Sequence, residues 1–237
     1  MSPSAPPTVG ADFALIIRMH RAYRVAVALA LAGTIAMTDA AAATPLHHAV
    51  SHGDEARVAS LVAEKAPLEA QDGQGRTALL LAVEQNHVGI ARTLLEAGAS
   101  PNTQAANQDT PWLLAGARGR TEIIRAMLPR KPDLSIRNRY GGNALIPACE
   151  RAHVEAIPLL LQSGIDVNHV NNLGWTCLLE IVILGDGGPR HQEAARLVLA
   201  AGADPNLADK DKVTPLRHAR ERGQREIAAM IETAGGR

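Results

Sequence analysis

Three neighbouring histidines, His47, His48 and His52, are the residues whose type and spacing come nearest to a chemical site. His48 and His52 are four residues apart, so on a helix they share a face, as two ligands of a transition metal must. Two histidines without a third ligand make a weak metal site. We therefore predict no bound metal, and a metal-handling protein is the least favoured of three functions considered below.

Nucleophilic and nucleotide chemistry have little support in the sequence. No Ser-His-Asp or Cys-His arrangement shows a recognisable local signature. The glycine-rich stretch 185–188 lacks the Lys and the Ser or Thr that a phosphate-binding loop requires. Cys149 and Cys177 have no metal-ligand spacing, and we interpret them as small buried apolar residues. The chain is predicted to have no catalytic site and no cofactor, and not to be an enzyme.

The composition predicts an all-α protein without affinity for nucleic acid. Of 237 residues 46% are hydrophobic but only 2% are aromatic, so Leu, Ala, Val and Ile must fill the core. Leu and Ala have high helix propensities, whereas a large sheet favours more β-branched and aromatic residues. Basic and acidic residues number 24 each, and no basic stripe stands out. A nucleic-acid partner is therefore not expected.

Residues 1–43 are interpreted as an export signal preceded by a Pro-rich upstream segment that lies before the native start or is disordered. From Met19 the chain has a short cationic stretch, an apolar run over 25–37, and small residues over 40–43 where a signal peptidase could cut. The apolar run is shorter than the ~20 residues that span a bilayer. We expect 1–18 to lie upstream of the native start, 19–43 to be a signal peptide resembling bacterial ones, and the protein to reach the periplasm. The alternative is an uncleaved leader that anchors it in the inner membrane.

A six-residue phrase recurs through the remainder of the chain. The first four intervals between its copies are 33 residues and the last is 38. The copies begin at Thr44, Thr77, Thr110, Asn143, Thr176 and Thr214.

Each copy predicts a short helix followed by a second one. Thr or Asn at the head is an N-cap residue, Pro suits the first helical position, and the following Leu and Ala point inward at helical spacing. The second segment carries apolar pairs such as Leu94 and Leu95, and a glycine such as Gly98 stands where a left-handed C-terminal cap is needed. Neither helix can bury its apolar face alone, so neighbouring units must stack.

The period and the Thr-Pro-Leu-His-x-Ala phrase resemble the ankyrin repeat. The resemblance covers residues 44–237 and implies a solenoid of about six helix-turn-helix units joined by β-turn fingers. It also implies that His47, the histidine of the phrase, is a structural hydrogen-bonding residue.

Several positions depart from the family pattern. Asn143 replaces Thr at the head of the fourth phrase, and Ile181 replaces Ala in the fifth. Gln108 and Lys212 stand where the turn before the phrase usually has Gly, so distorted turns are expected there. Pro158 lies in a second helix and is tolerated only in its first turn.

Two expectations concern units four and five. Cys149 and Cys177 belong to neighbouring units, which stack about 10 Å apart, whereas a disulfide needs Cα atoms within about 7 Å. We therefore predict two unpaired thiols. The segment 185–190 supplies five extra residues and is predicted to be a flexible loop that bulges from the stack.

The expected function is protein binding by a monomer, through finger tips and exposed first-helix positions. Trp112 occupies a core position, whereas Trp175 and Tyr140 are expected to project as binding hot spots. A second possibility is an accessory or protective factor for a periplasmic enzyme. The predicted partner-binding residues are Arg76, Asp109, Arg118, Arg139, Tyr140, Arg151 and Trp175, with Glu84 and Gln85 among the other free positions.

Overall fold

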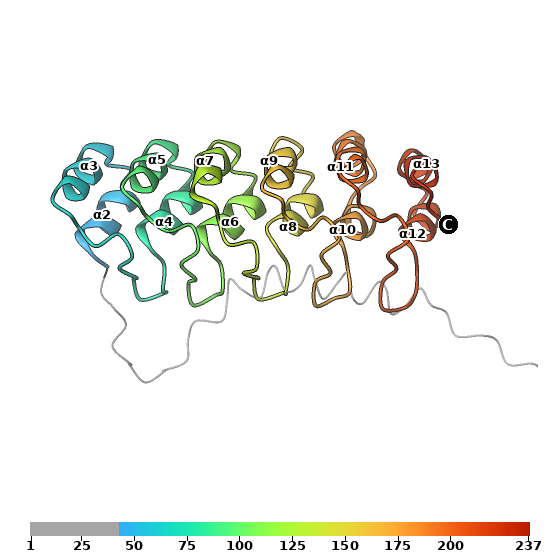
Figure 1. The fold of residues 1–237 in the computed structure, drawn as a ribbon, viewed down its shortest axis with the longest axis horizontal. Helices are drawn as coiled ribbons and strands as arrows, with labels where there is room; N and C mark the ends of the chain where they lie inside the picture. The colour runs from blue at the N-terminus through green and yellow to red at the C-terminus, as the bar shows by residue number, and fades with distance from the viewer. Residues whose placement is uncertain (1–42) are drawn as a thin grey trace, which may run out of the picture. The chain divides into compact units, whose positions relative to one another are not determined.

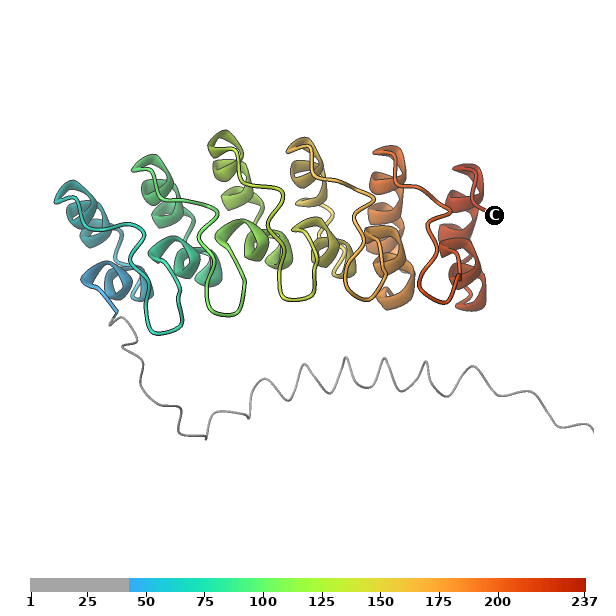
Figure 2. The same cartoon turned by 60° about the horizontal axis from the view of Figure 1, so that its bottom comes forward.

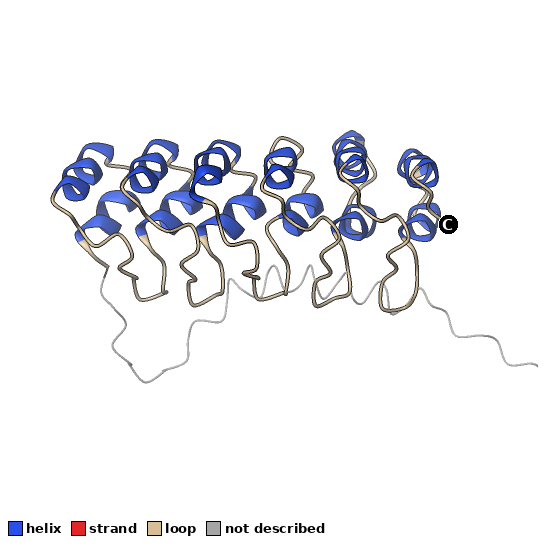
Figure 3. Cartoon of the chain, viewed as in Figure 1, coloured by secondary structure: helices blue, strands red, loops and turns tan. Residues whose placement is uncertain are grey.

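A computed structural model describes residues 43–237, and within this range every regular element is helical. The expected upstream segment and the leader up to residue 42 lie outside the described residues. No helix in the described part of the chain is long and apolar enough to cross a membrane. The all-α prediction is confirmed (Figure 3).

Six pairs of helices form two rows, as Figure 1 shows. The first helices of the pairs are α2 (Pro45–Ser51), α4 (Ala78–Gln85), α6 (Pro111–Arg118), α8 (Leu145–Glu150), α10 (Cys177–Leu184) and α12 (Pro215–Glu221). The second helices are α3 (Glu55–Ala63), α5 (Val88–Glu96), α7 (Thr121–Met127) with the 3₁₀ turn η1 (Leu128–Arg130), α9 (Ile157–Gln162), α11 (Pro189–Ala200) and α13 (Arg225–Thr233). Each second helix is joined to the next pair by a loop that extends past the row of first helices (Figure 2).

The turn that ends each of these loops is called a finger. The five fingers are residues 72–77, 105–110, 138–143, 171–176 and 209–214. A backbone hydrogen bond closes each finger, as between the Asp72 N–H and the Arg76 carbonyl at 3.0 Å. The last finger residue then starts the next first helix, so the finger is held rigidly on the stack.

The phrase residues begin the first helices as predicted. Thr77 Oγ1 accepts a hydrogen bond from the Leu80 N–H at 3.2 Å, and the threonines of four other phrases make the equivalent cap. Asn143 keeps this function, because its Oδ1 accepts from Leu145 N at 3.1 Å and from Ile146 N at 3.2 Å. Pro158 lies in the first turn of α9, where it removes no helical hydrogen bond.

Polar side chains link successive pairs at the ends of the first helices. At four of the five junctions between pairs, a polar side chain at or near the start of a second helix donates to a carbonyl in the last turn of the preceding unit's first helix, a group that has no partner within its own helix. The distances are 3.1 Å from Arg120 to Glu84, 3.3 Å from His153 to Ala117, 3.2 Å from His191 to Glu150 and 3.0 Å from Gln224 to Val182. From the second pair onward, each pair therefore receives a hydrogen bond from the next.

The core is a continuous aliphatic layer between the two rows. Leu94, Leu95, Ile123 and Ile124 are fully buried, and Trp112 joins them as predicted. Close packing of α6 against α8 requires a glycine, because a Cβ on Gly116 would lie 2.4 Å from the Ala144 carbonyl oxygen. The small residues of the sequence thus set the spacing of the stack.

The prediction of unpaired cysteines is wrong, because Cys149 and Cys177 form a disulfide with Cα atoms 5.6 Å apart. The spacing of about 10 Å applies to helix axes. Each Cα lies about 2.3 Å from its axis, which leaves about 5 Å between Cα atoms that face each other. Cys149 on α8 and Cys177 at the start of α10 face in this way and are both buried.

The segment 185–190 also differs in part from its prediction. Its last residues open α11, which has 12 residues against 6 in α9. Arg190 donates to Glu155 at 2.8 Å and to the Ala152 carbonyl at 3.2 Å. Residues 185–188 lie outside any helix, as predicted, whereas Pro189 and Arg190 lengthen a helix that binds the preceding unit.

The two turns without glycine keep the shape of the others. Gln108 and Lys212 have φ of 65° and 61°, close to the 72° of Gly75. The prediction of distorted turns at these two positions is therefore wrong. These two fingers instead hold a non-glycine residue in the left-handed region, which costs on the order of 1 kcal/mol each.

The disulfide generates a prediction about thiols and stability. The native protein should show no titratable thiol after denaturation without reductant. The Cys149→Ala/Cys177→Ala protein should lose about 2–4 kcal/mol of unfolding free energy, because the bond closes a long loop. Denaturant unfolding measures the loss, and reductant should destabilise the wild type but not the variant. Two titratable thiols would contradict the structure.

Candidate functional site

The candidate site is the surface formed by the fingers and the exposed ends of the first helices, here called the finger face. It includes eight residues that the sequence singled out. They are Arg76, Glu84, Gln85, Asp109, Arg118, Arg139, Tyr140 and Arg151, all at least partly exposed.

Asp or Asn at the first position makes four of the five fingers rigid. Asn138 Oδ1 accepts from the N–H groups of Tyr140 and Gly142, both at 2.9 Å. Asp72, Asn171 and Asp209 make the same pair of bonds in their fingers. The second finger has Ala105 at this position and relies on Asn107, which accepts from the Asp109 N–H at 3.0 Å. Finger residues are thus held at fixed positions, as a recognition surface requires.

Arg76 connects a finger to a helix and is mainly structural. Its guanidinium pairs with Asp72 at 2.8 Å and with Glu84 of α4 at 3.1 Å. Burial alone would raise the pKa of Asp72, but the hydrogen bonds from Arg76 outweigh burial and hold that pKa below its usual value. Arg76 and Glu84 therefore form one supported charge pair on the N-terminal part of the finger face.

Charges from two neighbouring units act on Asp109. Burial raises the pKa of Asp109, and the positive charges of Arg139 and Arg118 are near enough to oppose that shift. Arg139 also lies over the ring of Tyr140, with its guanidinium carbon 4.8 Å from the ring centroid. Arg139 and Tyr140 are therefore in contact, and Asp109 lies within electrostatic range of Arg139 and Arg118.

Arg151 lies at the end of α8 and is exposed. Its guanidinium donates to the Ala117 carbonyl at 2.6 Å and lies 3.8 Å from the Glu150 carboxylate. The side chain is therefore oriented along the finger face between units three and four.

Trp175 is not the exposed hot spot that the sequence predicted, because only 8% of it is accessible. Trp175 stands near the end of its finger, and its backbone N–H donates to Asn171 Oδ1 at 3.1 Å. Arg76 and Asp109 have the same position in their fingers and are also only partly exposed. This position faces the first helices and not the solvent, so a large apolar side chain there becomes buried.

Glu180 is a buried acid that sequence reasoning missed. Glu180 lies in α10, at a position of the phrase where the other copies have no acid. It is 5% exposed, and its carboxylate accepts a hydrogen bond from Asn171 Nδ2 at 2.8 Å. Burial and the nearby charge of Glu150 raise its pKa to about 8. The detectable signal was a carboxylate within the apolar run of the fifth phrase.

The histidines form no metal site. Thr44 N donates to His47 Nδ1 at 3.2 Å, so Nε2 carries the proton and donates to the Arg76 carbonyl at 2.9 Å. This confirms the structural interpretation of His47. His52 Nδ1 bonds the His48 carbonyl at 2.8 Å. Among residues 43–237 no group of three His, Cys, Asp or Glu side chains is arranged to hold a metal ion.

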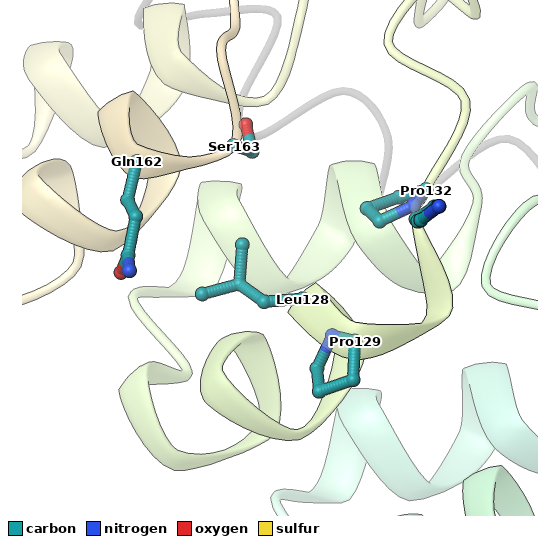
Figure 4. A pocket seen from close by; sticks show the side chains of 6 residues that line it. Leu128, Pro129, Pro132, Gln162 and Ser163 are labelled. Atoms are coloured by element: carbon teal, nitrogen blue, oxygen red, sulfur yellow. The ribbon is translucent and has the colours of Figure 1, made fainter.

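A depression of about 390 Å³ lies on the other row of helices, between η1 and the end of α9 (Figure 4). Leu128, Pro129 and Pro132 line one side, and Gln162 and Ser163 line the other. Its one titratable side chain is Lys131.

Comparison with known proteins gives one consistent family. A family model described as ankyrin repeats (3 copies) matches residues 19–105 and 97–171. The Escherichia coli (strain K12) ankyrin repeat protein YahD is 39% identical over 79% of this chain and 94% of its own.

Solved structures agree with the sequence relatives. An ankyrin repeat domain from Acinetobacter baumannii AYE is 49% identical and has a TM-score of 0.79, covering 81% of this chain and 98% of that domain. The ankyrin repeat protein EF0377 is 37% identical with a TM-score of 0.77, covering 79% and 96%.

The two aromatics of the fingers should respond differently to removal. Trp175→Ala should lower the unfolding free energy by about 3–5 kcal/mol, because it removes a buried ring. Tyr140→Ala should change it by about 0.5 kcal/mol or less, since Tyr140 is 39% exposed. Denaturant unfolding of the two variants makes the comparison. Equal losses would show that Tyr140 also belongs to the packing.

Glu180 should make stability depend on pH. Its pKa is about 8 in the folded protein against 4.5 as the ordinary value, so its stabilising effect is complete below pH 4.5 and is lost as pH rises through 8. The slope in between should be at most about 1.4 kcal/mol per pH unit. In Glu180→Gln the side-chain oxygen still accepts the hydrogen bond from Asn171. The unfolding free energy of this variant, measured by denaturant from pH 5 to 8, should depend less on pH than that of the wild type. An unchanged pH profile in the variant would exclude this assignment.

Proposed function

Since the chain belongs to the ankyrin-repeat family, we propose that it binds another protein through its finger face, as a monomer and without catalysis. Ankyrin repeats are generally protein-interaction modules. The observation that carries the proposal is the contact of Arg139 with the exposed ring of Tyr140 on a finger held by Asn138, within electrostatic range of Asp109. Mixed charge around an exposed aromatic is typical of protein interfaces.

We further propose that this binding takes place in the bacterial periplasm. The buried disulfide between Cys149 and Cys177 supports an oxidising compartment, because such bonds are rare in the bacterial cytoplasm. The order of charged, apolar and small residues over 19–43 supports export with cleavage. The bacterial origin of YahD and of the Acinetobacter domain is consistent with this location.

The test is capture of a partner from periplasmic extract by the full chain carrying a C-terminal tag, followed by mass spectrometry. A finger-face variant combines five alanine substitutions: Gln85→Ala, Arg118→Ala, Arg139→Ala, Tyr140→Ala and Arg151→Ala. It should weaken binding of the purified partner at least about 30-fold, as expected when hot-spot residues are lost.

The matched control carries Arg125→Ala and Arg196→Ala on α7 and α11, where both residues are exposed. It should bind the partner like the wild type, and both variants should unfold near the wild-type midpoint. A partner that binds the finger-face variant and the control equally would locate the interface elsewhere. Recovery of the tagged chain in the cytoplasm alone would reject the periplasmic location.

A further inference from the structure

We infer that the fingers 138–143, 171–176 and 209–214 recognise an acidic protein segment that carries apolar or aromatic side chains. This inference rests on the proposed function, because it names the chemistry of the partner for the same finger face. Tyr140 would contact the apolar side chains and the cations around it would contact the carboxylates.

Tyr140 is unusual in the described part of the chain, where Tyr140 and Val170 are the exposed large hydrophobic residues, at 39% and 47%. Tyr140 lies at the tip of a finger held by Asn138, and Arg139 lies over its ring. An exposed aromatic on a rigid support loses little conformational entropy when it is buried by a partner. This makes Tyr140 the anchor of the surface.

The three fingers form one continuous surface. The Asn172 N–H donates to the Tyr140 carbonyl at 2.9 Å, and Lys210 Nζ donates to the Asn172 carbonyl at 2.6 Å. Gly174 permits the second contact, because a Cβ there would lie 2.6 Å from Lys210 Cγ. A bound segment could therefore follow the finger tips from Tyr140 to Lys210.

Two of the acids near these fingers are buried, whereas the cations of the fingers are exposed. Asp209 is buried against His218 at 2.7 Å, and Glu180 is buried against Asn171. The exposed residues of the three fingers are Arg139, Tyr140, Asn172, Lys210, Asp211 and Lys212. Arg118 and Arg151 add two exposed cations at the neighbouring helix ends.

This arrangement favours carboxylates of a protein over a nucleic acid. A single-stranded nucleic acid needs a basic groove with several stacking aromatics, whereas these tips offer one aromatic ring and an intervening Asp211. Arginine presents a planar fork that pairs with carboxylates, and the neighbouring ring contacts apolar side chains. An acidic segment with apolar residues satisfies both features.

The experiment uses the full chain and a fluorescent random copolymer of Glu and Tyr as the probe, with anisotropy as the readout. We expect it to bind at least about tenfold more tightly than polyglutamate or a Lys and Tyr copolymer, because it alone supplies both contacts. Added salt should weaken the binding.

Two single variants test the assignment of residues. Arg139→Glu should reduce affinity for the Glu and Tyr copolymer about tenfold or more, because it reverses a charge. Tyr140→Ala should remove the preference over polyglutamate. Arg196→Glu on α11 is the matched charge control and should leave binding unchanged, with thermal midpoints confirming that all variants fold.

Three outcomes would overturn the inference. Oligothymidine binding as tightly as the Glu and Tyr copolymer would assign the surface to nucleic acid. Copolymer binding that survives both Arg139→Glu and Tyr140→Ala would place the contact elsewhere. A captured periplasmic partner that is lost from the five-substitution variant but binds both single variants fully would leave the proposed function standing and reject this chemistry.

Discussion

Each helix pair in this protein is completed by its neighbour, and the rest of the structure depends on that constraint. A pair of short helices exposes an apolar face and several carbonyls without partners. The adjacent pair covers the face with aliphatic side chains and supplies a donor such as Arg120 or His153 to the carbonyls. Because both needs are met at the same interface, the spacing of the units is fixed by packing and by hydrogen bonding together.

This constraint divides the residues of every unit between two tasks. Side chains such as Leu94 and Leu95 are buried in the stack, whereas the side chain of Tyr140 at a finger tip is exposed. The same interface holds the fingers at regular intervals, so side chains from three units act as one surface. Stability and recognition are therefore carried by different residues of the same repeat.

The repeat phrase was sufficient to predict the fold, because its caps and apolar spacing act locally. Thr77 caps α4 and Trp112 joins the core as the pattern required. Properties that depend on which residues of neighbouring units lie opposite each other were not predicted. The sequence does not show that Cys149 faces Cys177 across an interface, nor that the position of Trp175 in its finger faces inward. Glu180 was missed because burial of a polar residue depends on what the next unit places over it.

The disulfide also changes how a stack of this kind opens. In a solenoid whose units contact only their neighbours, partial opening begins at an end and advances one unit at a time. The bond between α8 and α10 makes units four and five a single block, so opening from either end must stop there or release both units together. The fingers 138–143 and 171–176 belong to that block. Tyr140, the proposed anchor, is thus carried by the segment expected to open last, and the proposed binding would not depend on whether the terminal units fray.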